Sequence, residues 1–258
     1  MGGERMREPD EVADAIDTVA AARRIAVMSG AGISTESGIP DFRGPNGLWT
    51  REPGAERLSS LQAYQEDPAV RLRSWQARLA HPAWDAEPNP AHLALVELER
   101  TDRLHAILTQ NIDGLHQRAG SSPDLVVELH GTMFDTVCLS CGDRRPMHAA
   151  LDRVRTGEPD PPCLVCGGII KSATISFGQA LDVDVLERAR DAAVTCDLML
   201  VAGSSLGVQP AAGLVGLAAR AGAAVVICNG SETPYDRLAA FVLRGQLGTV
   251  LPALVRGR

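Results

Sequence analysis

The feature that most constrains the fold is a series of short apolar runs separated by helical patterns. The runs occupy residues 25–28, 104–109, 125–129, 197–203, 223–229 and 241–244. Apolar residues recur at helical spacing between most of them, at residues 11–24, 92–100, 182–195 and 211–221. Strands that alternate with helices are typical of a parallel sheet covered on both faces. The sequence therefore predicts an α/β fold with a doubly wound parallel sheet.

Composition limits the partners of such a protein. Aromatic residues make up only 3% of the 258 residues although apolar residues make up 45%, so the core consists mainly of Ala, Val, Leu and Ile. The formal net charge of −7 leaves no basic surplus for phosphate contacts, so we expect no nucleic-acid partner. An acidic protein can still bind basic peptide segments.

Two further segments bear on location. Residues 1–10 are charged and lack the apolar core of a secretory signal. The most apolar stretch, residues 198–219, is interrupted by Ser204, Pro210 and several glycines, which indicates a strand, a loop and a helix rather than a membrane span. We therefore expect a cytoplasmic protein without a membrane partner.

Two segments break the alternation of strands and helices. Residues 45–90 contain three tryptophans and several prolines but no clear strand, and residues 136–168 contain four cysteines and little apolar sequence. We interpret both as insertions that form a small lobe. The predicted nucleotide-binding domain then comprises residues 1–44, 91–135 and 169–258.

The four cysteines are arranged as two knuckles. Cys138 and Cys141 form one CxxC pair, and Cys163 and Cys166 form the other. This spacing indicates one tetrahedral structural zinc ion, because each knuckle places two thiolates on the same metal. Disulfides or buried thiols are the alternatives, and disulfides are unfavourable in a cytoplasmic protein.

A glycine turn follows the first predicted strand. Gly30-Ala31-Gly32 resembles the start of a dinucleotide-binding fingerprint, but Thr35 occupies the position of the third glycine. A plain strand–helix turn is an equally good interpretation. The polar residues 34–44 favour a loop folding over a cofactor, with Phe42 as a lid and Arg43 near a phosphate.

Five motifs in order make the comparison with a known family specific. They are Gly30-Ala31-Gly32-Ile33-Ser34, Gly38-Ile39-Pro40-Asp41-Phe42-Arg43, Thr109-Gln110-Asn111-Ile112-Asp113, His130-Gly131 and the paired CxxC knuckles. In this order the chain, from about residue 25 onward, resembles the sirtuins, which are NAD-dependent protein lysine deacylases. The resemblance implies a Rossmann-like large domain, a lobe of zinc site and helices, and an acyl-lysine peptide bound between them.

The resemblance also implies a catalytic centre. His130 matches the general base that activates a ribose hydroxyl, Gln110 and Asn111 match groups that orient the ribose, and Asp113 matches the residue facing the nicotinamide carboxamide. We assign His130 and Asn111 as catalytic. A turn at residues 111–114, a core role for His130, and His116 as a rival base are the alternatives.

The remaining contacts rest on the same resemblance. The residues expected to bind NAD are Gly30, Ala31, Gly32, Ser34, Thr35, Asp41, Phe42, Arg43, Gln110, Asn111, Ile112, Asp113, Gly203, Ser204, Ser205, Asn229, Gly230 and Leu247. The residues expected to contact an acyl-lysine protein or peptide are Phe177, Gly178 and Val208.

The chain departs from the family at three places. Lys171-Ser172 replaces an Arg-Pro pair, and Gln179 replaces a glutamate near the peptide cleft. Members that prefer negatively charged acyl groups have a Tyr-x-x-Arg pair where this chain has Trp75-Gln76-Ala77-Arg78. We therefore expect acetyl or another uncharged acyl group.

Two other functions are compatible with parts of the sequence. Mono-ADP-ribosyl transfer would use the same NAD site with a different acceptor. A zinc-ribbon nucleic-acid module would need a basic face near the knuckles, but acidic residues offset the arginines there. The sequence assigns neither an oligomeric state nor a protein target.

Overall fold

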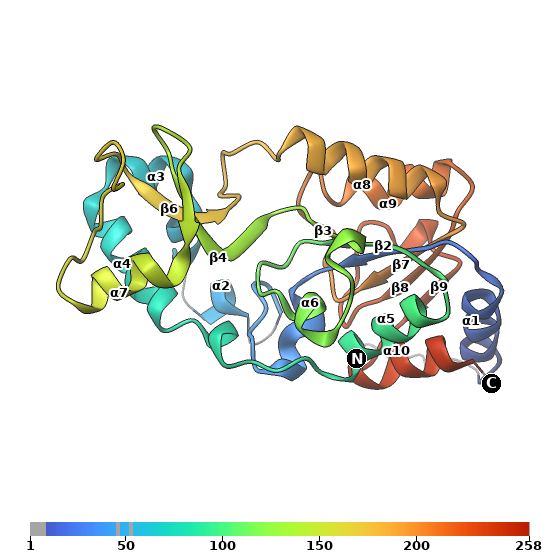
Figure 1. Ribbon diagram of the computed structural model, residues 1–258. Coiled ribbons are helices and arrows are strands. Elements are labelled where there is room, and N and C mark those ends of the chain that lie inside the picture. Colours follow the sequence, from blue (N-terminus) through green and yellow to red (C-terminus); the bar gives the residue numbers. More distant parts are fainter. Residues whose placement is uncertain (1–8, 45–46, 52–53, 258) are drawn as a thin grey trace.

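A computed structural model describes residues 9–44, 47–51 and 54–257 (Figure 1). The sequence-based predictions for residues 1–8, including the missing secretory signal, lie outside the described residues. The chain forms one large and one small sheet, each with its own set of helices. Within the described ranges, no helix is both long and apolar enough to cross a membrane.

The large sheet contains six strands in the order β3-β2-β1-β7-β8-β9. Every neighbouring pair is parallel. The strands are β1 Ile25–Ser29, β2 Leu104–Thr109, β3 Val126–Glu128, β7 Leu198–Ala202, β8 Ala224–Cys228 and β9 Phe241–Leu243. This arrangement confirms the predicted doubly wound parallel sheet.

Helices cover both faces of this sheet. The helices α1 Pro9–Ala21, α5 Pro90–Arg100 and α10 Leu247–Arg256 share one apolar core with it, and α8 Val183–Thr195 and α9 Gly213–Arg220 share the other (Figure 1). In β1, Ile25 and Val27 belong to the first core, whereas Ala26 and Met28 belong to the second. Successive side chains of a strand point to opposite faces, so a continuous apolar run is what a doubly covered strand requires.

The order of the strands reverses at β1. The chain proceeds outward from β1 through β2 to β3, and later returns to place β7 on the other side of β1. Ser29 is in register with both Thr109 and Ala202, so the carboxyl ends of β1, β2 and β7 lie together. In open α/β sheets, ligands bind in the crevice outside such a reversal.

The small sheet is antiparallel, in the order β5-β4-β6. Its strands are β4 Gly131–Cys138, β5 Arg144–Pro146 and β6 Ile170–Thr174. It therefore begins before residue 136 and ends after residue 168, beyond both ends of the second predicted insertion. The helices α3 Leu61–Glu66, α4 Pro68–Leu79 and α7 Met147–Arg155 lie beside it (Figure 1).

Short helices complete the described chain. Two are α-helical, α2 Leu48–Arg51 and α6 Leu115–Ala119. The 3-10 helices are η1 Ala31–Ser37, η2 Ala55–Ser59, η3 Pro82–Trp84, η4 Pro123–Leu125 and η5 Asp236–Leu238. The loop expected from residue 34 thus begins as a 3-10 helix. Its Ile33 carbonyl accepts a hydrogen bond from Asn89 Nδ2 (2.8 Å), and Gly38 ends it in the left-handed region.

Candidate active site

The glycine turn packs directly on the end of β7. The Gly30 amide donates to the Ala202 carbonyl (3.1 Å) and the Gly32 amide donates to the Gly203 carbonyl (2.8 Å). A Cβ on either glycine would lie 2.8 Å from the Gly203 carbonyl oxygen, closer than a side chain tolerates. Thr35, at the position of the missing third glycine, instead donates its hydroxyl to the Gly32 carbonyl (2.9 Å).

A buried polar cluster lies beside this turn. Ser34 Oγ donates to Asp113 Oδ2 (2.7 Å), and Asn111 Nδ2 donates to Ser34 Oγ and to the Gly30 carbonyl, both at 3.2 Å. The Leu115 amide donates to Asp113 Oδ1 (3.0 Å). Burial raises the pKa of Asp113, although these hydrogen bonds partly oppose the shift. The cluster therefore presents fixed polar groups at the carboxyl ends of β1 and β2.

A second set of polar groups, which the sequence analysis missed, lies at the ends of β1 and β2 and binds the backbone of Asn111. Ser29 Oγ donates to Thr109 Oγ1 (2.8 Å), and the Asn111 amide donates to the same Thr109 oxygen (3.1 Å). Ser29 and Thr109 are the last residues of neighbouring strands and are paired in register. Polar residues ending two adjacent apolar runs were the available signal for this set.

The rival base His116 belongs to this set. Its Nε2 lies 2.8 Å from Ser29 Oγ, and the side chain is buried. Burial, and secondarily the nearby His92, lowers the pKa of His116 to about 3. An enclosed, neutral imidazole of this kind supports the strand ends and is unavailable to an external substrate.

His130 occupies the connection between β3 and β4. Its Nδ1 lies 3.1 Å from the Gln110 carbonyl oxygen. A carbonyl only accepts hydrogen bonds, so Nδ1 carries the proton and Nε2 of the neutral ring has a free lone pair. Burial lowers the pKa of His130, partly offset by the bond to Gln110, so the neutral ring is the main form at pH 7.

The backbone fixes the position of His130. The Ile175 amide donates to the His130 carbonyl (2.8 Å), and the next residue, Gly131, has a φ of 69°. A Cβ on Gly131 would lie 2.2 Å from the Ala173 carbonyl oxygen, so only glycine fits. His130 is therefore anchored where the chain crosses from the large sheet to the small one.

Other expected NAD contacts lie across the strand ends from this cluster. Gln110 Nε2 donates to Ser204 Oγ (2.8 Å), which connects the ends of β2 and β7 over β1. Ser205 is half-buried beside it. Asn229 and the exposed Gly230 follow β8, and Arg244 Nη1 donates to the Asn229 carbonyl (2.8 Å).

Three aromatic side chains connect the segment after η1 to Phe177, a residue expected to contact the peptide. Trp49 lies 4.9 Å from Phe42 and 5.6 Å from Phe177, measured between ring centroids. The Arg43 guanidinium lies 4.5 Å from the Trp49 ring centre. The Asp41 carboxylate accepts from the Gly44 amide (3.0 Å), which closes the turn before Trp49. The sequence analysis did not assign Trp49 to the site, because none of the three tryptophans of the first insertion belongs to a recognisable motif.

The remaining expected residues are more scattered. Ala31 is half-buried on η1, Ile112 packs partly buried against Leu115 and Met133, and Gly178 adopts a positive φ after Phe177. Val208 precedes α9, and its carbonyl accepts from the Ala212 amide (2.9 Å). Leu247 is buried in the core at the start of α10, so only its backbone is left for an external contact.

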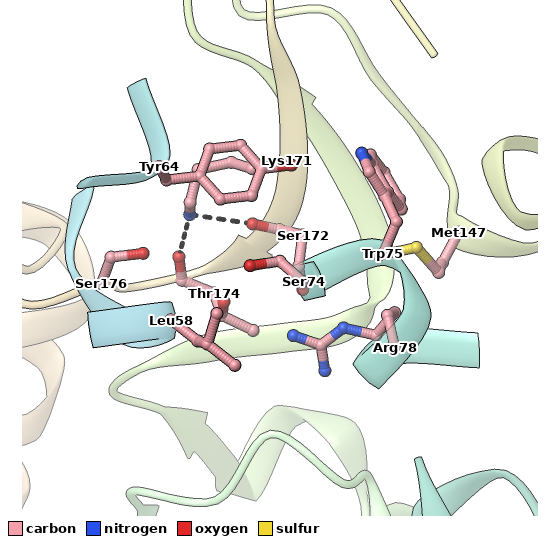
Figure 2. Close-up of a pocket in the computed structure, with 10 residues that line it drawn as sticks. All are labelled: Leu58, Tyr64, Ser74, Trp75, Arg78, Met147, Lys171, Ser172, Thr174 and Ser176. Atoms are coloured by element: carbon pink, nitrogen blue, oxygen red, sulfur yellow. Dashed lines mark hydrogen bonds between the residues drawn. The ribbon is translucent and has the colours of Figure 1, made fainter. Parts of the chain in front are cut away.

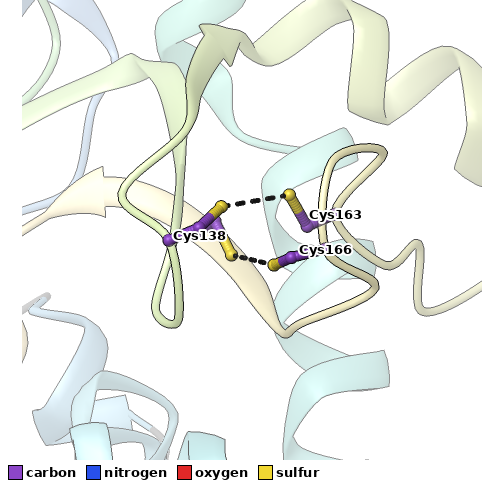
Figure 3. A group of neighbouring side chains, drawn as sticks. Cys138, Cys163 and Cys166 are labelled. Atoms are coloured by element: carbon purple, nitrogen blue, oxygen red, sulfur yellow. Dashed lines mark hydrogen bonds between the residues drawn. The ribbon is translucent and has the colours of Figure 1, made fainter.

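The four knuckle cysteines converge on one point (Figure 3). Their sulfur atoms all lie within 4.8 Å of one another, and the Cys138–Cys166 and Cys141–Cys163 separations are 3.5 and 3.7 Å. A tetrahedron with zinc–sulfur bonds of about 2.3 Å has edges of roughly 3.8 Å. Gly142 and Gly167 adopt left-handed turns after each second cysteine. The cluster therefore fits one structural zinc ion, whereas Cys196 and Cys228 are buried in the large-sheet cores.

The site also fits a dinucleotide. Close backbone packing at Gly30, Gly32 and Gly203 leaves the strand ends free of side chains, and buried polar groups surround this point. Gln110 and Ser204 extend the polar surface toward β7 and β8. These residues would hold the cofactor across the reversal of strand order.

Comparisons with known proteins agree with this geometry. A sequence model of the Sir2 family matches residues 30–210. The NAD-dependent protein deacetylase 2 of Streptomyces coelicolor is 52% identical over 233 residues, which are 90% of this chain and 97% of that protein. One solved Sir2 enzyme has a TM-score of 0.87 at 39% identity and covers 96% of this chain and 98% of its own. A Sir2 structure with a p53 peptide and NAD⁺ has a TM-score of 0.83 at 32% identity, with coverages of 92% and 94%.

Proposed function

This chain belongs to the Sir2 family, and we propose that it is an NAD-dependent protein lysine deacylase acting on acetyl-lysine. In the reaction, the amide bond of the acyl-lysine and the bond between nicotinamide and ribose both break. The acyl group is transferred to a ribose oxygen, one water is consumed, and the products are free lysine, nicotinamide and O-acyl-ADP-ribose. NAD, when bound, supplies the electrophilic ribose carbon and the leaving group.

The observation that carries this proposal is the position of His130 relative to residues 110–113. The base is hydrogen-bonded to the backbone of Gln110, whose neighbour Asn111 belongs to the buried polar cluster. A general base must lie within reach of the proton that it removes. The shared segment supports placing a ribose hydroxyl within reach of His130 when the nicotinamide half lies beside Asn111.

Different residues of the chain have different roles in this reaction. His130 Nε2 accepts the proton of the ribose 2′-hydroxyl, and the Gln110 carbonyl stabilises the imidazolium that results, because Nδ1 already donates to it. Gln110 and Asn111 orient the ribose, and Asp113, which accepts from Ser34 Oγ, faces the nicotinamide carboxamide. Phe42, Trp49 and Phe177 exclude water from the reacting groups.

The proposed preference for an uncharged acyl group is supported by the residues around Phe177, which is expected to contact the peptide. Phe177 is 44% exposed, and its backbone pairs with the segment before α3 through the Phe177 amide and the Ser59 carbonyl (2.7 Å). Gln179, in place of a glutamate, turns its side chain back to accept from the Ser176 amide (3.3 Å). With a neutral amide in place of a carboxylate, Gln179 contributes no charge beside Phe177, which supports an uncharged edge of the proposed peptide site.

The finer assignments belong to the same proposal. On the basis of the family resemblance, we also propose that the chain divides into two lobes and is cytoplasmic. The further residues proposed to contact NAD are Ser205, Asn229, Gly230 and Leu247. They are supported by the placement of the first three residues at the ends of β7 and β8. No oligomeric state is assigned.

The direct test is incubation of the purified protein with NAD and an acetylated lysine peptide, followed by mass spectrometry. We expect stoichiometric deacetylated peptide, nicotinamide and O-acetyl-ADP-ribose. ADP-ribose attached to protein without O-acetyl-ADP-ribose would instead establish mono-ADP-ribosyl transfer. A parallel succinylated peptide tests the acyl preference, and faster turnover of that peptide would contradict it.

A further inference from the structure

Two buried histidines, His92 of α5 and His116 of α6, are used by no step of the proposed reaction. Among the residues that the structure describes, most unpartnered buried side-chain atoms belong to two groups. One group lines the small-lobe cavity near Trp75 and Arg78, the segment already compared with acyl recognition (Figure 2). The other group includes His92 Nε2 and His116 Nδ1, one nitrogen of each buried ring.

A hydrogen bond at the start of α5 fixes the tautomer of His92. The Asn89 amide donates to His92 Nδ1 (3.3 Å), and an amide nitrogen only donates, so Nδ1 carries no proton. Burial lowers the pKa of His92 to about 4, so the ring is neutral at pH 7 and its proton is on Nε2. His92 Nε2 is therefore a buried donor without a partner among the described atoms.

The complementary group is free on His116. Ser29 Oγ donates its only proton to Thr109 Oγ1 (2.8 Å), so it accepts from His116 Nε2, which lies 2.8 Å away. The Nδ1 of this neutral ring is then an unpartnered acceptor within the described part of the chain. The rings of His92 and His116 are in contact, with centroids 5.1 Å apart. Since buried polar groups are almost always satisfied, this matched donor and acceptor indicate a link between the rings, either direct or through one water.

Both ends of this histidine pair reach the segments expected to bind NAD. At one end, Asn89 also donates its Nδ2 to the Ile33 carbonyl in η1 (2.8 Å). At the other end, the Thr109 hydroxyl accepts from the Asn111 amide (3.1 Å). Asn111 Nδ2 donates to Ser34 Oγ, again in η1 (3.2 Å). The contacts therefore run from η1 through both histidines to Asn111 and back to η1.

We propose that His92 and His116 are positioning residues of the deacylase site, a role that rests on the proposed function. The His116 Nε2–H holds the Ser29 hydroxyl so that its proton points to Thr109, whose oxygen also receives the Asn111 amide. His92 connects this arrangement to the start of α5 and thereby to η1. The pair keeps η1 and Asn111 in a fixed relation while both rings stay buried.

The first test is the ¹⁵N spectrum of the histidine side chains, which distinguishes protonated from bare ring nitrogens. In the full-length, zinc-loaded protein at pH 7 we expect Nε2–H on both His92 and His116, the opposite of the Nδ1–H expected on His130. The variants His92→Asn and His116→Gln identify the two signals. A proton on His116 Nδ1 would overturn the proposal, whether or not the protein is a deacylase.

The second test compares two substitutions of His116. His116→Leu removes the bond to Ser29 and should lower kcat/KM for NAD roughly 10- to 100-fold, because small displacements at a reacting site have effects of this size. In His116→Gln the side-chain amide can still donate to Ser29, so most of the activity should return. The matched control is His105→Leu, which removes an imidazole bound to the Thr195 hydroxyl (2.8 Å) at the amino end of β2 and should leave kcat/KM unchanged.

His92→Asn provides a second variant in case His116→Leu does not fold. Its side-chain oxygen can still accept from the Asn89 amide, but it lacks the Nε2 donor, so kcat/KM for NAD should fall in the same direction. All rates are measured well below the unfolding temperature of each variant. Full activity in folded His116→Leu, or equal losses in His116→Leu and His116→Gln, would show that these histidines only fill space.

A parent protein that forms no O-acetyl-ADP-ribose would refute the proposed function and leave the positioning role to be decided by binding. The affinity for NAD, measured by calorimetry on the same variants, supplies that readout. We expect it to fall roughly tenfold in His116→Leu and to recover in His116→Gln, since one hydrogen bond is lost and then restored. Equal affinity in the parent and His116→Leu would overturn the proposal on this readout.

Discussion

The imidazole Nδ1 of His130 lies 3.1 Å from the carbonyl oxygen of Gln110, and this contact decides which nitrogen of the ring can act as a base. Gln110, which orients the base, directly precedes Asn111 and lies three positions before Asp113. A shift of this segment would therefore move the base and the proposed nicotinamide site together. The Gln110 carbonyl thus sets the tautomer of His130, whereas burial is the main cause of its lowered pKa.

Replacing His130 with Ala should reduce kcat by roughly 10²- to 10⁴-fold, the usual contribution of a general base. The parent should lose activity only on the acid side, because protonation of Nε2 removes the base. Since the pKa of His130 is lowered, that loss should occur below pH 6.5 and leave activity level around pH 7. A pH profile of kcat/KM for NAD measures both effects.

The matched control is His148→Ala, which removes an exposed histidine from α7. It should retain full activity and the same pH profile. An acid limb centred above pH 6.5 in the parent, or an active His130→Ala protein, would show that another group is the base.

Asp113→Asn should separate stability from activity. The pKa of Asp113 is raised in the folded protein, so the folded state binds its proton more tightly than the unfolded state. Stability is therefore lost as the pH rises from the ordinary aspartate value through the raised one. The amide can still accept from Leu115 and can donate to Ser34, so the variant should be more stable at pH 7, by roughly 2–4 °C for each kcal/mol relieved.

Thermal unfolding at several pH values measures this effect. The gain should vanish in acid, where the parent carboxyl is also neutral, and kcat/KM for NAD should fall at pH 7. Asp85→Asn, at an exposed position, should change neither quantity. A variant that is less stable than the parent at pH 7 would contradict the burial argument.

Gly131→Ala should both destabilise the protein and displace the base. The alanine would have to adopt a φ of 69°, and its Cβ would meet the Ala173 carbonyl oxygen at 2.2 Å. Gly157→Ala shares the positive φ but has open space around the added methyl group. The control should lose about 1–2 kcal/mol of unfolding free energy through backbone strain alone.

Urea unfolding gives the two losses, and kcat gives the effect on the base. We expect Gly131→Ala to lose clearly more stability than Gly157→Ala and also to lose activity. Equal losses, with kcat unchanged, would mean that β4 and β6 can separate at this point without moving His130.

The sequence predicts the large sheet well because its strands are buried on both faces. A run such as residues 25–28 has no exposed position and therefore reads as a continuous apolar segment. The zinc cluster is equally visible, since the spacing within each knuckle is set by the geometry of the metal. Both features are encoded locally.

Other parts of the site depend on pairing between distant segments. β5 consists of Arg144, Arg145 and Pro146, all exposed, so it has no apolar pattern and exists because β4 pairs with it. The bond between Ser29 and Thr109 joins residues 80 positions apart. Such contacts follow from strand register, which a single sequence does not display. The extension of the small sheet back to residue 131 has the same origin.

Removal of zinc should unfold the small lobe before the large sheet. Cys138 and Cys163 are buried, and zinc would replace the protons of the four thiols and join the two knuckle segments. Cys138→Ser should reduce the zinc content, measured by elemental analysis, from one ion per chain to none. The unfolding temperature should fall by more than roughly 10 °C, because the free energy of structural zinc binding is folding free energy. Cys196→Ser, in the core beside α8, should keep one zinc ion, so loss of zinc from both variants would place the metal elsewhere.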